Sequence, residues 1–66
     1  MIGVVDAYDE AIVHDKPTVF GDPVCILRNM AKVLIDEKES TRDFYKICTP
    51  AGVEGYCLKL YLTIEQ

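Results

Sequence analysis

The chain has 66 residues, of which 50% are hydrophobic and 27% are charged, and its net charge at pH 7 is −4. This length predicts a single small domain, spanning residues 1–66, with one modest hydrophobic core. The acidic balance disfavours binding to nucleic-acid phosphates, and no apolar run approaches the roughly 18 residues of a membrane-spanning helix. We therefore expect no nucleic-acid partner and no membrane partner.

The N-terminus does not resemble a secretory leader, because its first apolar run ends early at Asp6 and no basic residue precedes that run. The sequence as it stands therefore predicts a cytoplasmic protein. A cell-wall or virion location is the alternative if the chain belongs to, or associates with, a larger protein.

Short apolar runs alternate with turn signals in the first half of the chain. Strands are predicted over residues 2–7, 11–14, 24–28 and 31–36. Proline has no backbone donor, so Pro17 ends the second strand, and residues 18–23 form a loop. A helix through residues 26–35 is the competing interpretation, because several apolar residues there share one helical face. The β-branched residues and the turn signal at Asn29 favour strands.

A polar loop over residues 37–43 separates these strands from the stretch that organises the second half. There, Phe44–Cys48 reads as a strand, Pro50 and Gly52 predict a turn, and a second strand follows. The two strands should form a hairpin, followed by a short connector and a closing strand at residues 63–64.

Alternation along this hairpin predicts which side chains face the core. The lysine in the middle of the first strand should point to water, so Tyr45 and Ile47 face inward and Phe44 faces outward. Beyond the turn, Glu54 marks the outward face, so Tyr56 joins Phe44 outside. Its inward neighbour is a glycine, and a side chain at that position would crowd the interior. Five to seven short strands with regular turns indicate an all-β fold, a small barrel or sandwich.

Four segments, in order and over nearly the whole chain, resemble the bacterial SH3-like (SH3b) domains. They are residues 11–17, 27–33, 44–47 and 51–62. The last segment is the most specific, because two glycines and two tyrosines stand at the family's spacing. Phe44 stands where the family has a tryptophan. Met30 stands at a turn glycine, so Asn29 is expected to take any positive φ.

The resemblance implies a small SH3-like barrel of five to seven short antiparallel strands, with a short 3-10 turn near Leu58–Tyr61. It also implies a non-catalytic binding module without a cofactor. Members of the family often anchor cell-wall hydrolases or phage lysins to peptidoglycan by recognising its peptide cross-bridges, and others stand alone. The expected ligand is therefore a peptide or a cell-wall peptide.

Exposed aromatic residues are the predicted ligand site, since they supply a large contact area at low entropic cost. The candidates for a shallow aromatic groove are Tyr8, Phe44, Tyr56 and Tyr61, with Glu54 as an acidic neighbour. The alternative function is a structural or assembly protein of a phage or mobile element. Such a protein would oligomerise, for example as a homodimer, through a strand edge or the aromatic face.

An enzyme is not predicted, because the sequence has neither a phosphate-binding loop nor a hydrolase elbow. The single histidine, His14, and the three cysteines lack the short spacing of a zinc site. We expect Cys25, Cys48 and Cys57 to be reduced residues of the core. One disulfide with a spare thiol is the alternative.

Overall fold

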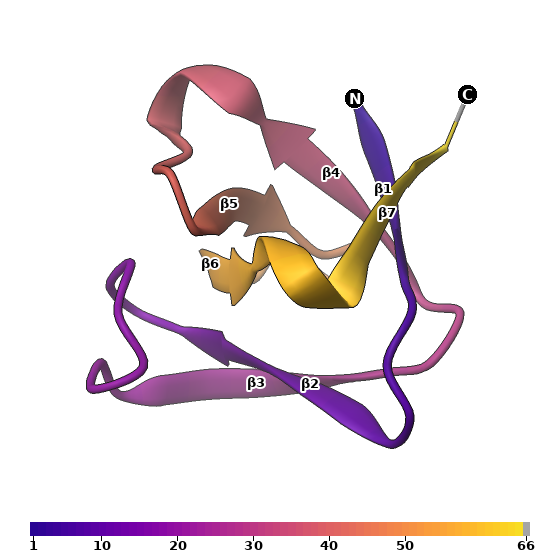
Figure 1. Cartoon of the computed structure of the whole chain (residues 1–66), viewed down its shortest axis with the longest axis horizontal. Coiled ribbons are helices and arrows are strands. Elements are labelled where there is room, and N and C mark those ends of the chain that lie inside the picture. The colour runs from indigo at the N-terminus through magenta and orange to yellow at the C-terminus, as the bar shows by residue number, and fades with distance from the viewer. Residues whose placement is uncertain (66) are drawn as a thin grey trace.

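The computed structural model describes residues 1–65, and strands make up most of it (Figure 1). The strands are β1 (Ile2–Val5), β2 (Glu10–His14), β3 (Pro23–Arg28), β4 (Lys32–Asp36), β5 (Phe44–Cys48), β6 (Glu54–Leu58) and β7 (Leu62–Glu65). Two 3-10 turns, η1 (Glu37–Glu39) and η2 (Lys59–Tyr61), precede β5 and β7. The predicted all-β class and the predicted 3-10 turn are confirmed.

All seven strands belong to one antiparallel sheet with the order β3-β2-β6-β5-β4-β1-β7. The predicted hairpin is β5–β6, in which Phe44 is opposite Leu58 and Ile47 is opposite Gly55. The first and last strands of the chain are neighbours, since Ile2 pairs with Glu65 and Val5 with Leu62. The sheet curls into a small barrel-like fold (Figure 1).

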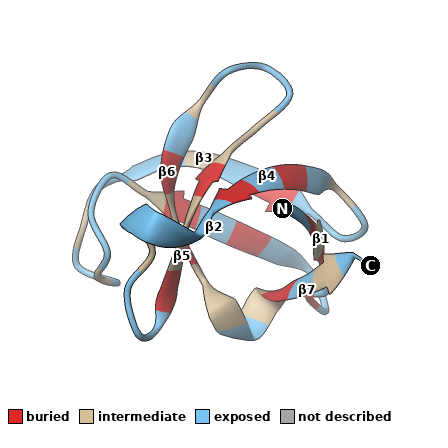
Figure 2. Ribbon diagram, turned by 90° about the horizontal axis from the view of Figure 1, so that it is seen from above, coloured by how far each residue is buried: buried red, intermediate tan, exposed pale blue. Residues whose placement is uncertain are grey.

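One hydrophobic core fills the curled sheet, and every strand contributes to it. Its buried members are Val5, Ala7, Ala11, Val13, Leu27, Val33, Ile35, Ile47, Cys57 and Leu62. In Figure 2 the buried positions recur along the strands, whereas the connections between them are mostly exposed. Ile47 is 1% exposed and Tyr45 packs against the cluster, as the alternation predicted. Gly55 and Cys57 also face inward.

The turn between β5 and β6 forms where Pro50 and Gly52 predicted it. The Thr49 carbonyl accepts the N–H of Gly52 at 2.9 Å, and the Thr49 hydroxyl accepts the N–H of Val53 at 3.1 Å. Gly52 has a φ of 86°, a conformation that favours glycine. This turn sets the register of the hairpin.

The connection from β3 to β4 differs from the prediction in one respect. Residues 26–35 form two strands and a turn, as predicted, and not a helix. The positive φ in the turn, 72°, belongs to Met30, whereas the prediction placed it at Asn29. The Asn29 side-chain oxygen accepts the backbone N–H of Ala7 at 3.2 Å, which holds Asn29 in place. The left-handed position therefore falls on Met30, whose side chain extends into solvent.

Two element boundaries also differ from the prediction. β1 ends at Val5 and not at Ala7, although the Asp6 N–H still donates to the Tyr61 carbonyl at 2.8 Å in the register of the β1–β7 pair. The polar loop after β4 begins with η1, whose Lys38 N–H is accepted by the Asp36 side chain at 3.1 Å. Within residues 1–65, no helix has the length and apolar character needed to cross a membrane.

Candidate functional site

The outer face of β2, β6 and β5 carries a second, smaller group of packed side chains. His14 on β2 pairs with Tyr56 on β6, and Leu58 on β6 pairs with Phe44 on β5. The rings of His14 and Phe44 meet edge to face, with their centroids 6.2 Å apart. These side chains lie on the opposite side of the sheet from the main core.

The loop of residues 15–22, hereafter the 15–22 loop, is closed at its base by hydrogen bonds. The Asp15 N–H donates to the Asp22 carbonyl at 2.9 Å, and the Asp22 N–H donates to the Asp15 carboxylate at 2.8 Å. The His14 Nδ1 donates to the Gly21 carbonyl at 3.0 Å. The loop is therefore anchored to β2 by its own backbone and by His14.

The prediction that Phe44 projects into solvent is wrong. Alternation placed the ring on the correct face, but Phe44 is only 6% exposed. Pro17, Thr18 and Val19 of the 15–22 loop line the same hollow as Phe44, so the loop folds over this face of β5. Phe44 therefore supports the loop, and it offers a ligand little of its own surface.

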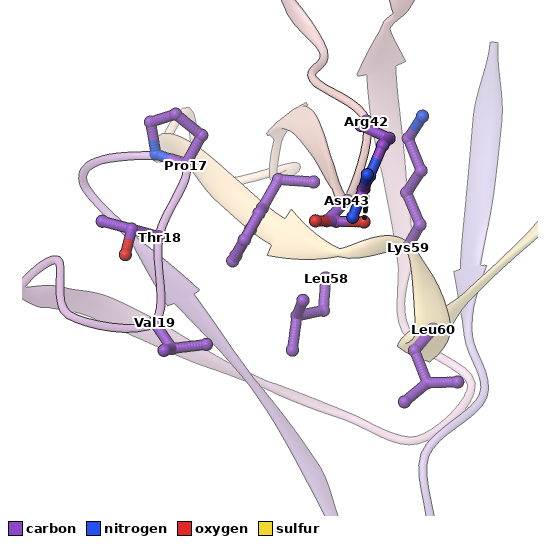
Figure 3. Close-up of a pocket in the computed structure, with 9 residues that line it drawn as sticks. Pro17, Thr18, Val19, Arg42, Asp43, Leu58, Lys59 and Leu60 are labelled. Atoms are coloured by element: carbon purple, nitrogen blue, oxygen red, sulfur yellow. Dashed lines mark hydrogen bonds and ion pairs between the residues drawn. The ribbon is translucent and has the colours of Figure 1, made fainter.

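Two hollows lie side by side between the 15–22 loop and the end of β6. The first, of about 600 Å³, is lined by Pro17, Thr18, Val19, Arg42, Asp43, Phe44, Leu58, Lys59 and Leu60 (Figure 3). The second, of about 290 Å³, is lined by Glu10, Ile12, His14, Val19, Leu58 and Tyr61. Because Val19 and Leu58 line both, the two hollows adjoin, and together they are called the groove.

The groove has an apolar middle and charged ends. Figure 3 shows Leu58 on β6 between Val19 on the 15–22 loop and Leu60 on η2. Arg42 and Lys59 lie at one end, where Arg42 is 3.3 Å from the carboxylate of Asp43. Glu10 lies at the other end. An elongated ligand would therefore meet a basic end, an apolar centre and an acidic end.

The structure brings together two of the five predicted site residues, Phe44 and Tyr61. Tyr8 is fully exposed between β1 and β2 and lines neither hollow of the groove. Tyr56 and Glu54 lie farther along β6, around Lys46. The Lys46 Nζ is 5.3 Å from the centroid of the Tyr56 ring and 3.8 Å from the Glu54 carboxylate.

Several groove residues were not predicted from the sequence, chiefly Val19, Leu58 and Ile12. Alternation from the buried Ala11 and Val13 would have placed Ile12 and His14 on the outer face of β2. No sequence pattern shows that the 15–22 loop returns to this face, because its closing hydrogen bonds depend on the folded backbone.

The three cysteines differ in burial. Cys57 is fully buried, while Cys25 and Cys48 are half-buried, and all three are free thiols. Burial, with a smaller contribution from the nearby Cys25 thiol, raises the pKa of Cys57 to about 11. Burial also raises the pKa of Cys25. Because the thiolate is the reactive form, these environments disfavour nucleophilic chemistry at both positions.

Thiol labelling is expected to separate Cys57 from the other two cysteines. At pH 8 the native protein should react with a maleimide at Cys57 far more slowly than at Cys48, because Cys57 is buried and protonated. Mass spectrometry of timed digests measures each rate, and labelling in denaturant provides the fully reactive control. Equal rates at the two positions in the native protein would contradict this description of the core.

Within residues 1–65, no group of three or more His, Cys, Asp or Glu side chains is placed to hold a metal ion.

No protein-family model matches the chain, and no curated protein matches it in sequence.

Proposed function

We propose that this protein is a non-catalytic binding module that holds a short peptide segment in the groove between the 15–22 loop and the end of β6. The observation that carries this proposal is the sharing of Val19 and Leu58 by both hollows, which gives the adjoining hollows a common apolar lining. A peptide-binding groove needs such a lining together with a wall that is ordered before the ligand arrives.

An extended peptide fits the shape and chemistry of the groove better than a compact small molecule. Small-molecule sites enclose most of their ligand's surface, whereas Val19 at one wall is 55% exposed and Leu60 is more exposed still. A peptide could place one or two apolar side chains against Val19 and Leu58 and leave its backbone in water.

The charges at the two ends give the ligand a direction. A carboxylate would be favoured near Arg42 and Lys59, although Asp43 offsets part of the Arg42 charge. A basic side chain or an amino group would be favoured near Glu10. Arg42 and Glu10 are exposed, whereas Lys59 is half-buried with its Nζ 5.0 Å from the centroid of the Tyr45 ring. Affinity should fall as salt is added, because exposed charges are screened. Cell-wall peptides carry such charged groups and are the class that the family resemblance implies.

Titration of the 15N-labelled protein tests the proposal. The ligands are basic, acidic and proline-rich peptides with an apolar centre, and soluble peptidoglycan fragments. We expect at least one class to shift the amide signals of Val19, Leu58 and Tyr61 together, because these residues line the groove. Shifts confined to other surfaces, or none at millimolar ligand, would overturn the proposal. A response to the fragments alone would select the wall peptide.

The Val19→Asp variant is expected to lose at least tenfold in affinity for the peptide found in that titration. The substitution places a charge in the apolar centre of the groove, and central apolar contacts of an interface carry about 1–3 kcal/mol each. Phe20→Asp is the matched control, because Phe20 is next in the chain and exposed but lines neither hollow. Equal affinity of the two variants would contradict the assignment of Val19.

A further inference from the structure

Strand β3 is an open edge of the sheet. Within residues 1–65 its one neighbour is β2, and at six residues it is longer than every other strand described. An edge strand presents unpaired backbone N–H and C=O groups at alternate residues, and these groups can pair with another chain. Val24 and Ile26 on this edge are 42% and 56% exposed.

The other edge of the sheet is protected in a way that β3 is not. β7 has four residues and carries Glu65, which forms an ion pair with Lys32 at 2.9 Å. Short strands and charged side chains discourage edge pairing. On β3, Pro23 and a register shift at Val24 protect only the start of the strand, and Cys25, Ile26 and Leu27 are uncharged and pair regularly with β2. The two edges therefore differ in how readily they can accept another strand.

The sequence along this edge is complementary to itself in the antiparallel direction. Asp22 immediately precedes β3 and Arg28 ends it, with apolar residues between them. When two copies pair about a two-fold axis centred on Cys25, Asp22 of each copy lies opposite Arg28 of the other, and Val24 lies opposite Ile26. Neither Asp22 nor Arg28 forms an ion pair among the described residues.

We propose that two copies of this chain associate through antiparallel pairing of their β3 strands. The pairing satisfies free backbone groups of both edges from Cys25 onward and places Asp22 of each copy near Arg28 of the other. It also brings the exposed Ile26 of each copy beside the partly exposed Val24 of the other, one methyl group of which lies against Gly55. Ile12, which pairs with Ile26 across β2 and β3, extends the apolar surface beside the new contact. A second copy is the favoured occupant because the partner strand needs a basic residue opposite Asp22 and an acidic residue opposite Arg28. The antiparallel β3 strand of another copy has both.

This dimer is weak and concentration-dependent, since one strand pair buries less area than the roughly 1,200–2,000 Å² of a stable interface. Sedimentation velocity between 10 µM and 1 mM should show the average mass rising from the 7.4 kDa of one chain toward twice that value. A mass that stays at 7.4 kDa at 1 mM would overturn the proposal.

Substitutions that swap the charges of Asp22 and Arg28 test whether these residues lie in the interface. Asp22→Arg or Arg28→Asp alone should shift the monomer–dimer midpoint at least fivefold toward higher concentration, because each places like charges opposite one another. The double variant carrying both substitutions should restore dimerisation, since the complementary order is reversed but kept. Circular dichroism checks that all variants are folded. A folded double variant that does not regain dimerisation would contradict the antiparallel register.

Two lysine substitutions test whether the dimer forms through the β3 edge or through another part of the surface. Ile26→Lys should abolish the dimer, because charged edge residues block strand pairing. Leu34→Lys is the matched control, since Leu34 is equally exposed but lies on β4, inside the sheet. Loss of the dimer with Leu34→Lys but not with Ile26→Lys would assign the contact to another face and refute the proposal. Val19→Asp should leave the dimer intact, because Val19 lies outside β3 and is not part of the proposed contact.

Discussion

Replacing Gly55 with valine is expected to destabilise the fold strongly and to lower its melting temperature. A Cβ atom at this position would lie 2.5 Å from Cγ1 of Val13 and 2.7 Å from the carbonyl oxygen of His14. The second contact is with backbone, so no rotation of a side chain can relieve it. Overpacking of this kind costs about 1–3 kcal/mol and sometimes more, and a domain of this size has roughly 3–10 kcal/mol of stability in total. Thermal unfolding followed by circular dichroism measures the effect.

Two alanine variants serve as controls for the cause of this effect. Gly52 has a φ of 86° and no neighbouring atom within 4 Å of an added Cβ, so Gly52→Ala should cost only the backbone strain, about 1–2 kcal/mol. Gly55→Ala tests crowding without the larger valine side chain, and it should be less stable than Gly52→Ala. The explanation fails if Gly55→Val melts within a few degrees of the unchanged protein.

Truncation of Phe44 to alanine is expected to lower the melting temperature by more than about 12 °C. Removing a buried aromatic ring costs about 3–5 kcal/mol, and each kcal/mol corresponds to roughly 4–8 °C in a domain of this size. The ring contacts His14 edge to face, and His14 holds the 15–22 loop through the Gly21 carbonyl. The loss should therefore loosen the loop as well as the sheet, which the amide signals of residues 15–22 would report.

Tyr8→Ala is the matched control for Phe44→Ala, because it removes an aromatic ring that is fully exposed. Surface changes of this kind usually alter stability by less than about 0.5 kcal/mol. Phe44→Leu should retain most of the stability, since it refills much of the volume. Near-identical melting temperatures for the two alanine variants would show that Phe44 contributes no more to folding than an exposed ring.

Local patterns were sufficient to predict most of the fold. The alternation around Ile47 and Cys57 identified the inward face of β5 and β6, because a strand repeats every two residues. Gly52 predicted the turn between them, since few other residues adopt its φ. The crowding at Gly55 also followed from alternation alone. Each of these features depends on residues close together in the sequence.

The groove was harder to predict because it depends on contacts between distant segments. Phe44 was placed on the correct face, but its burial requires the 15–22 loop to fold across β5, and no periodicity records that contact. Val19 and Leu58 line the same hollows for the same reason. At Met30 the local preference was overridden by a hydrogen bond from Ala7 to Asn29, which also joins distant parts of the chain.

The pairing of β1 with β7 constrains the order in which this chain can fold. β1 precedes the other described strands in the chain, yet one of its two sheet neighbours, β7, follows all of them. Closing that pair joins the two described strands that are farthest apart in sequence, and the entropic cost of closing a loop grows with its length. During translation, β1 therefore keeps an unpaired side until residues 62–65 have left the exit tunnel.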